Sequence, residues 1–149
     1  MDTAVAVENY SLTMKRTLKH SKQDVYDAWT KKESLIAWFA PTAEFTTIIH
    51  EQDLKVGGKY KLEMLAPDGE SHLIHGEYVA LNPFDQVAFT WEWEGDEVEV
   101  NSLVTIELTE KDGLTEMVLV HDKLESQNMV DIHSEGWTGC LSQLDEYFK

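Results

Sequence analysis

Residues 126–148 read SQNMVDIHSEGWTGCLSQLDEYF, and their apolar side chains recur every three or four positions. This spacing predicts an amphipathic helix of roughly 20 residues that follows Ser126 and ends the chain. One stripe carries Met129, Ile132, His133, Gly136, Trp137, Cys140, Leu141, Leu144 and Phe148, while Asp131, Glu135, Gln143 and Glu146 lie mainly opposite. The interior Gly136 costs helix stability, which suggests a close approach to the sheet or to a ligand at that position.

Upstream of this helix, alternating apolar and polar residues predict antiparallel strands. The alternation is strongest from Val87 to Trp93. We expect the other strands over residues 10–18, 42–50, 59–65, 71–81, 102–109 and 114–121. Turn chemistry separates them at Pro67-Asp68-Gly69, Asn82-Pro83-Phe84-Asp85 and Lys111-Asp112-Gly113, because proline fixes φ and glycine accepts a positive φ.

Two short helices are predicted between the first and second strands. Ser21 is a good N-cap for the first, and the second is stopped by Pro41. An antiparallel sheet must bury its apolar face, and the long terminal helix is the element large enough to cover it. We therefore expect an α+β fold in which a curved antiparallel sheet wraps around the C-terminal helix, as one domain over residues 1–149 with residues 1–9 flexible.

Composition disfavours several classes of partner. The 28 acidic residues outnumber the 12 basic ones and give a net charge of −16, which repels nucleic acid and anionic membranes. The residues before Tyr10 lack the features of a secretory signal, and no apolar run is long enough for a membrane span. With Cys140 as the single cysteine, nothing argues for an oxidising compartment, so a cytoplasmic protein is expected.

Short motifs in a fixed order resemble a known family. They comprise Arg16, Val25-Tyr26-Asp27-Ala28-Trp29, Trp38-Phe39-Ala40-Pro41, Asp53-Leu54-Lys55-Val56-Gly57-Gly58-Lys59-Tyr60, Pro67-Asp68-Gly69, Gly76-Glu77-Tyr78, Phe89-Thr90-Trp91 and Glu135-Gly136-Trp137 with Leu141 and Leu144. The chain resembles the activator of heat-shock protein 90 ATPase homologue-1-like family of the START-like (SRPBCC, Bet v 1-like) superfamily, which implies a helix-grip fold. Lys55 stands where that family usually has arginine. Lysine cannot make the planar, bidentate contact with a carboxylate that an arginine guanidinium makes.

The resemblance implies several activities, since superfamily members stimulate a chaperone ATPase, bind lipids or steroids, or act as polyketide cyclases. We expect binding of a small hydrophobic molecule in a cavity between the sheet and the C-terminal helix. The alternatives are a cyclase or hydrolase-like enzyme and a module that binds a chaperone. The candidate cavity residues are Trp38, Phe39, Tyr60, Leu62, Met64, Phe89, Trp91, Trp93, Met117, His121, Met129, His133 and Trp137, for each of which ordinary core packing is the competing interpretation.

No catalytic motif or cofactor-binding motif is recognisable, and the six histidines lack the spacing of a zinc site. For the strand over residues 71–81 the sequence does not determine which face points to the core. Either His75 and Glu77 or Tyr78 could point inward. An inward polar pair would favour the enzyme. A homodimer formed through an exposed edge strand is a further alternative.

Overall fold

The computed structural model describes residues 10–94 and 102–149. The expected flexibility of residues 1–9 concerns a segment outside these ranges. The elements are β1 (Tyr10–Leu18), α1 (Lys22–Thr30), α2 (Lys32–Trp38), β2 (Thr46–Gln52), β3 (Lys59–Leu65), β4 (Ser71–Asn82), β5 (Gln86–Trp93), β6 (Ser102–Lys111), β7 (Leu114–Leu124) and α3 (Gln127–Tyr147). The predicted order of strand, two short helices, six strands and a long helix is confirmed.

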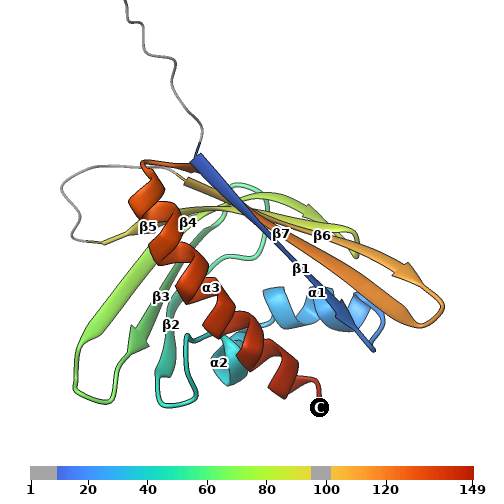
Figure 1. Cartoon of the computed structure of the whole chain (residues 1–149), viewed down its shortest axis with the longest axis horizontal. Coiled ribbons are helices and arrows are strands. Elements are labelled where there is room, and N and C mark those ends of the chain that lie inside the picture. The colour runs from blue at the N-terminus through green and yellow to red at the C-terminus, as the bar shows by residue number, and fades with distance from the viewer. Residues whose placement is uncertain (1–9, 95–101) are drawn as a thin grey trace, which may run out of the picture.

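The strands form one seven-stranded sheet in the order β1-β7-β6-β5-β4-β3-β2, and every neighbouring pair is antiparallel. The sheet curves around α3, which crosses it diagonally (Figure 1). Of the two short helices, α2 contacts α3, while α1 packs against α2 and strands β5, β6 and β7. The predicted helix-grip architecture is therefore confirmed, and the space between α3 and the sheet is where a core or a ligand site can form.

Local sequence chemistry explains several element boundaries. The side chain of Ser21 caps α1 by accepting a hydrogen bond from the backbone N–H of Asp24 at 3.1 Å, and Ser126 caps α3 through Met129 at 3.2 Å. The β6–β7 hairpin has a two-residue loop, in which Asp112 and Gly113 have φ of 55° and 79°. Positive φ at both positions matches the twist of the flanking strands.

The predicted start of the second strand is wrong. We expected it from Thr42, whereas β2 begins at Thr46. The intervening residues form a turn, in which the backbone N–H of Phe45 donates to the Thr42 carbonyl at 3.3 Å and that of Glu44 to the Thr42 hydroxyl at 3.2 Å. A threonine hydroxyl offers the backbone this alternative to a strand ladder.

At Gly139 the backbone of α3 comes close to the loop after α2. A Cβ atom built there would sit 2.3 Å from the carbonyl oxygen of Pro41, so only glycine fits. At Gly136, where the sequence suggested close approach, a Cβ would meet no atom within 4 Å. The helix is thus held tightly against the loop after α2 and leaves open space one turn earlier. None of the described helices combines the length and hydropathy needed to cross a bilayer.

Candidate functional site

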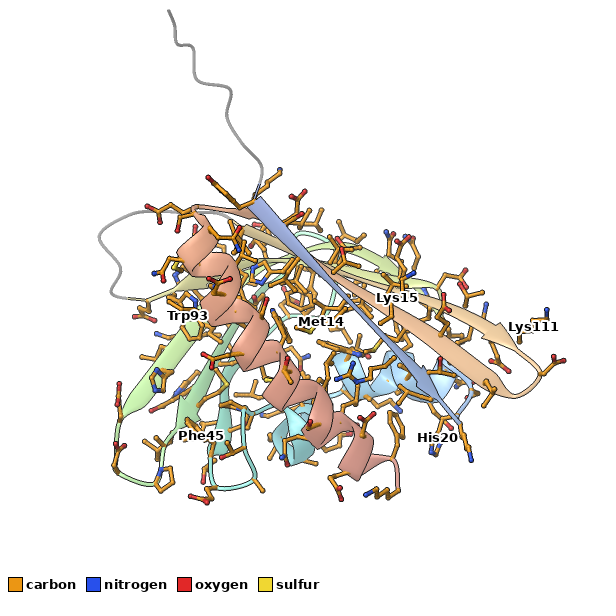
Figure 2. All side chains as sticks on the ribbon, viewed as in Figure 1. Met14, Lys15, His20, Phe45, Trp93 and Lys111 are labelled. Carbon is orange, nitrogen blue, oxygen red and sulfur yellow. The ribbon has the colours of Figure 1, made fainter. Side chains whose placement is uncertain are left out.

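A groove of about 580 Å³ lies between α3 and the strands β3–β5. Its wall is mostly apolar and aromatic, and it is formed by Pro41, Phe45, Met64, Ser71, His72, Leu73, Trp91, Trp93, Glu94, Ile132, His133, Gly136, Trp137 and Cys140. Figure 2 shows Trp93 and Phe45 on the same flank of α3. The volume falls within the range of roughly 300–1,000 Å³ that small-molecule sites occupy.

Three tryptophans form the inner wall of this groove. The ring of Trp91 lies 5.0 Å from that of Trp137 on α3 and makes a T-shaped contact with Trp93 at 5.6 Å. The strand period of two places Trp91 and Trp93 on the same face of β5, and that face points at α3. The ring of His72 lies 6.1 Å from that of Phe45 and 6.4 Å from that of Trp93.

Hydrogen bonds fix His133 in one neutral form. The indole N–H of Trp93 donates to Nε2 at 3.0 Å, and Nδ1 lies 2.8 Å from the carbonyl oxygen of Met129. Because a carbonyl can only accept, Nδ1 carries the proton. Burial lowers the pKa of His133, and the hydrogen bond to Met129 opposes that shift only in part.

His121 is likewise neutral and fully bonded. Its Nδ1 accepts from the indole N–H of Trp137 at 3.0 Å, and its Nε2–H donates to the Ser102 hydroxyl at 2.8 Å. That hydroxyl donates in turn to the carbonyl of Trp91 at 2.8 Å. Burial first, and the nearby His133 ring at 4.7 Å second, lower the pKa of His121 to about 3. Neither imidazole has a nitrogen left to exchange a proton with a ligand.

The predicted cavity residues fall into four groups. Five line the groove, namely Met64, Trp91, Trp93, His133 and Trp137. Phe39, Tyr60, Leu62 and Phe89, again with Trp91, surround a separate gap of about 20 Å³ within the core. Trp38, Met117 and His121 are enclosed in the core with polar partners of their own. Met129 packs against the edge of the core and does not line the groove.

Several lining residues were not among the predicted cavity residues. Ile132 and Cys140 share the apolar stripe of α3 with His133 and Trp137, so helical spacing could have found them. Gly136, which the sequence marked as a point of approach to the sheet or to a ligand, also lines the groove. Pro41, Phe45, Ser71, His72, Leu73 and Glu94 come from loops and strand ends, and no local pattern marks them.

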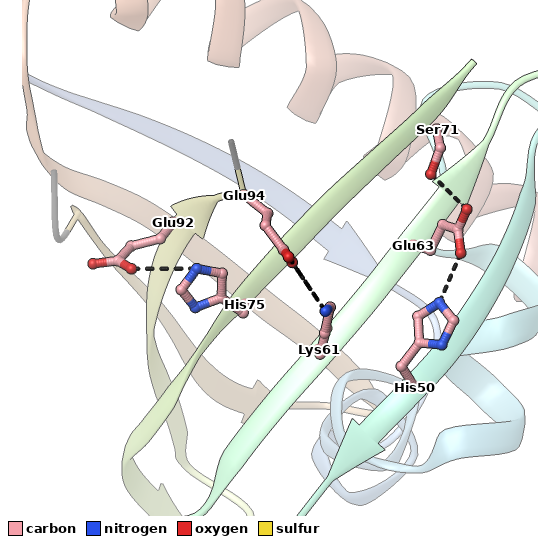
Figure 3. Close-up of polar contacts among 7 residues, drawn as sticks. All are labelled: His50, Lys61, Glu63, Ser71, His75, Glu92 and Glu94. Atoms are coloured by element: carbon pink, nitrogen blue, oxygen red, sulfur yellow. Dashed lines mark hydrogen bonds and ion pairs between the residues drawn. The ribbon is translucent and has the colours of Figure 1, made fainter. Parts of the chain in front are cut away.

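The structure shows which face of β4 points to the core, a question that the sequence left open. Tyr78 points inward and is 4% exposed, and its hydroxyl accepts from Gln52 at 3.1 Å. His75 and Glu77 share the opposite parity, on the outer face, where His75 pairs with Glu92 at 3.4 Å (Figure 3). The inward polar pair that would favour a cyclase is therefore not formed by these two residues.

The same outer face carries a small polar cluster. Glu63 accepts from the Ser71 hydroxyl at 2.5 Å and contacts His50 at 2.7 Å, and Lys61 pairs with Glu94 at 3.1 Å (Figure 3). The hydrogen bond from Ser71 and then that from His50 hold the pKa of Glu63 below its usual value. Glu63 lies on the face of β3 opposite Tyr60, Leu62 and Met64. Within residues 10–94 and 102–149, no three His, Cys, Asp or Glu side chains come together as a metal site would require.

Comparison with known proteins gives a family and a fold. The family model described as "Activator of Hsp90 ATPase homolog 1-like protein" matches residues 19–149. A solved protein from Chromobacterium violaceum has a TM-score of 0.85 at 25% identity, covering 93% of this chain and 96% of that one. The AHSA1 protein from Silicibacter pomeroyi has a TM-score of 0.80 at 23% identity, covering 92% and 96%. No curated protein matches the chain.

Proposed function

Because this chain belongs to the activator of Hsp90 ATPase homolog 1-like family, we propose that it binds a small hydrophobic molecule in the groove between α3 and the sheet. The observation that carries the proposal is the open volume beside Gly136. Its backbone is exposed to space where an ordinary core would place a side chain, and aromatic residues surround that space. A helix interior tolerates glycine at a cost, and room for a ligand is a reason to keep it.

The chemistry of the wall favours binding over catalysis. Both histidines of the region are neutral and engaged at both ring nitrogens. The thiol of Cys140 is buried, which raises its pKa to about 12 and keeps it in the unreactive protonated form. The groove offers a ligand mainly aromatic surface. Burying apolar area of a ligand against this surface is favourable by about 25 cal/mol per Å².

Ligand titration monitored by intrinsic tryptophan fluorescence tests this function, since three of the five tryptophans line the groove. Native mass spectrometry of the purified protein first reveals any molecule that co-purifies. The panel contains fatty acids, lipids and aromatic polyketides. We expect a saturable change with at least one class, and weaker binding in Gly136→Leu, which places a leucine side chain in the part of the groove beside α3.

The matched control is Thr138→Leu, which adds the same side chain on the exposed side of α3. It should bind as the natural protein does. A protein indifferent to every ligand, or one in which Gly136→Leu binds normally, would overturn the proposal. In that case the chaperone interaction named in the family description becomes the function to test, by capture of a purified chaperone.

A further inference from the structure

A third histidine borders the groove, apart from the buried pair His121 and His133. His72 lies near the start of β4 and shares the inner face of that strand with Tyr78, because the two are an even number of positions apart. Its partner across the ladder is Met64, another residue of the groove wall. Partners that lie directly opposite each other point to the same face of a sheet. The imidazole therefore lies on the groove side of β4.

The ring of His72 is accessible and has no hydrogen bond. It contacts the rings of Phe45 and Trp93 at 6.1 and 6.4 Å, and 38% of its side chain is exposed. The carboxylate of Glu70 lies 3.7 Å from Nε2, which is an ion-pair distance and too long for a hydrogen bond. Within the described part of the chain, both ring nitrogens are thus left to bond with water or with a ligand.

The other polar groups of the groove wall are engaged or out of reach. Four side chains already bond to protein partners, namely Ser71 with Glu63, Trp93 with His133, Glu94 with Lys61 on the outer face, and Trp137 with His121. The indole nitrogen of Trp91 is sealed from solvent, and the thiol of Cys140 is buried. His72 is therefore the side chain of the wall that offers a ligand an unused hydrogen-bonding group.

The charges around His72 argue against an anionic ligand. None of the residues lining the groove is lysine or arginine, and the charged group that pairs with His72 is the carboxylate of Glu70. A ligand carboxylate would find no fixed positive charge in this wall, in a protein whose net charge is −16. A hydroxyl suits the site better. A neutral imidazole has one donor and one acceptor nitrogen, and a hydroxyl can bond to either.

We propose that the groove takes an uncharged, largely apolar ligand with a hydroxyl group, such as a phenol or a hydrophobic alcohol, and that the imidazole of His72 binds this hydroxyl. The inference deepens the proposed function and rests on it. The apolar body of the ligand packs on the tryptophans of the wall. His72 then selects a ligand with a hydroxyl over a hydrocarbon of the same shape.

Calorimetric titration with naphthol and methylnaphthalene, which have nearly the same shape, tests the inference. The quantity to compare is the ratio of their two association constants, because water releases the methyl compound more readily whichever residue receives it. The variant His72→Phe keeps a ring beside Phe45 and Trp93 and removes both nitrogens. We expect this ratio to shift against naphthol by roughly 2- to 5-fold, the effect of one neutral hydrogen bond at a partly exposed position. The affinity for methylnaphthalene should stay nearly unchanged.

The same strand offers a matched control. His75→Phe makes the identical change on the outer face of β4, where His75 pairs with Glu92, and it should leave the ratio unaltered. His72→Gln keeps a donor and an acceptor, so it should retain part of the preference for naphthol. In the natural protein, the ring ¹⁵N signals of His72 should move further with naphthol than with methylnaphthalene. This readout does not depend on any variant folding.

The outcomes separate this inference from the proposed function. If Gly136→Leu binds both compounds as tightly as the natural protein does, the groove is not the ligand site and both proposals fall. If neither compound binds the natural protein, this inference falls, while the broader ligand panel decides the proposed function. If both bind but His72→Phe leaves the ratio unchanged, or His75→Phe shifts it equally, the groove binds ligands and His72 does not select them. Tighter binding of naphthoate than of naphthol would overturn the assignment of an uncharged ligand.

Discussion

The indole nitrogen of Trp137 lies 3.0 Å from Nδ1 of His121, and this bond joins α3 to β7 through the buried core. Both side chains are almost fully enclosed, with exposed fractions of 2% and 0%. The bond also fixes the imidazole tautomer, since Nδ1 must accept and Nε2 must then donate to Ser102. The position of the terminal helix on the sheet thus depends on a directional contact as well as on apolar packing.

Removal of either partner should destabilise the protein. In His121→Leu the N–H of Trp137 loses its acceptor, and we expect the free energy of unfolding in urea to fall by about 1–3 kcal/mol. Trp137→Phe should cost at least as much, and the double variant less than the sum by roughly 0.5–1.5 kcal/mol. As a control, Tyr26→Phe in α1 should combine additively with His121→Leu. Additivity in the first pair would show that the bond contributes nothing.

Stability should decrease on mild acidification because of the two buried histidines. Both have pKa values below the ordinary 6.5, that of His121 at about 3. Below pH 6.5 the unfolded chain binds protons at these rings more readily than the folded protein does. Their contribution is therefore complete above pH 6.5 and is lost as the pH falls, over a range that extends to about pH 3 for His121, with a slope of at most about 1.4 kcal/mol per pH unit for each ring.

The non-titrating variant His121→Gln isolates one share of this effect. Urea unfolding between pH 6.5 and 5 should give a shallower dependence on pH than in the natural protein, whatever the absolute stability of the variant. An equal or steeper slope would mean that His121 takes up its proton as readily in the folded state as in the unfolded one.

Alanine at the two glycines of α3 should have opposite effects. At Gly136 the new Cβ meets nothing within 4 Å, so Gly136→Ala should stabilise the protein by roughly 0.5–1 kcal/mol through helix propensity. At Gly139 the Cβ would sit 2.3 Å from the Pro41 carbonyl, so Gly139→Ala should destabilise by about 1–3 kcal/mol. Thermal unfolding of the two variants decides this, and a shift of the same sign in both would contradict the placement of the helix.

The polar cluster on the outer face of the sheet predicts that the pKa of Glu63 depends on Ser71. Loss of the Ser71 hydroxyl removes the largest cause of its lowered pKa, so Ser71→Ala should raise that pKa towards 4.5. Carboxyl carbon shifts followed by NMR across acidic pH measure it directly. Ser11→Ala, on β1 at the far edge of the sheet, should leave Glu63 unchanged. An unaltered titration in Ser71→Ala would remove the hydroxyl from the explanation.

Local patterns were sufficient to predict the architecture of this chain. Alternation from Val87 to Trp93, the Asp112-Gly113 turn and the caps Ser21 and Ser126 each determine structure within a few residues. The start of β2 was misplaced because Thr42 can stabilise either a strand or, through its hydroxyl, the turn that it forms.

The groove was predicted only in part, because periodicity tells which face a side chain occupies and not whether its neighbours fill the space. Trp91 and Trp137 were correctly placed on facing surfaces, yet Trp38 has the same aromatic character and packs entirely within the core. Phe45 and His72 join the wall through the packing of a loop and a hairpin end, which no short segment of sequence encodes.

The order of the strands has a consequence for how the protein is made. β1 lies at one edge of the sheet and pairs only with β7, from Tyr10 opposite Leu124 to Leu18 opposite Thr115. Its sole ladder therefore spans most of the sequence, and such distant pairings are slow to form. During synthesis, β1 emerges long before its partner β7. A nascent chain that stalls before β7 leaves unpaired the edges of β1 and β6 that β7 would cover. The sheet can therefore be finished only after β7 has left the ribosome.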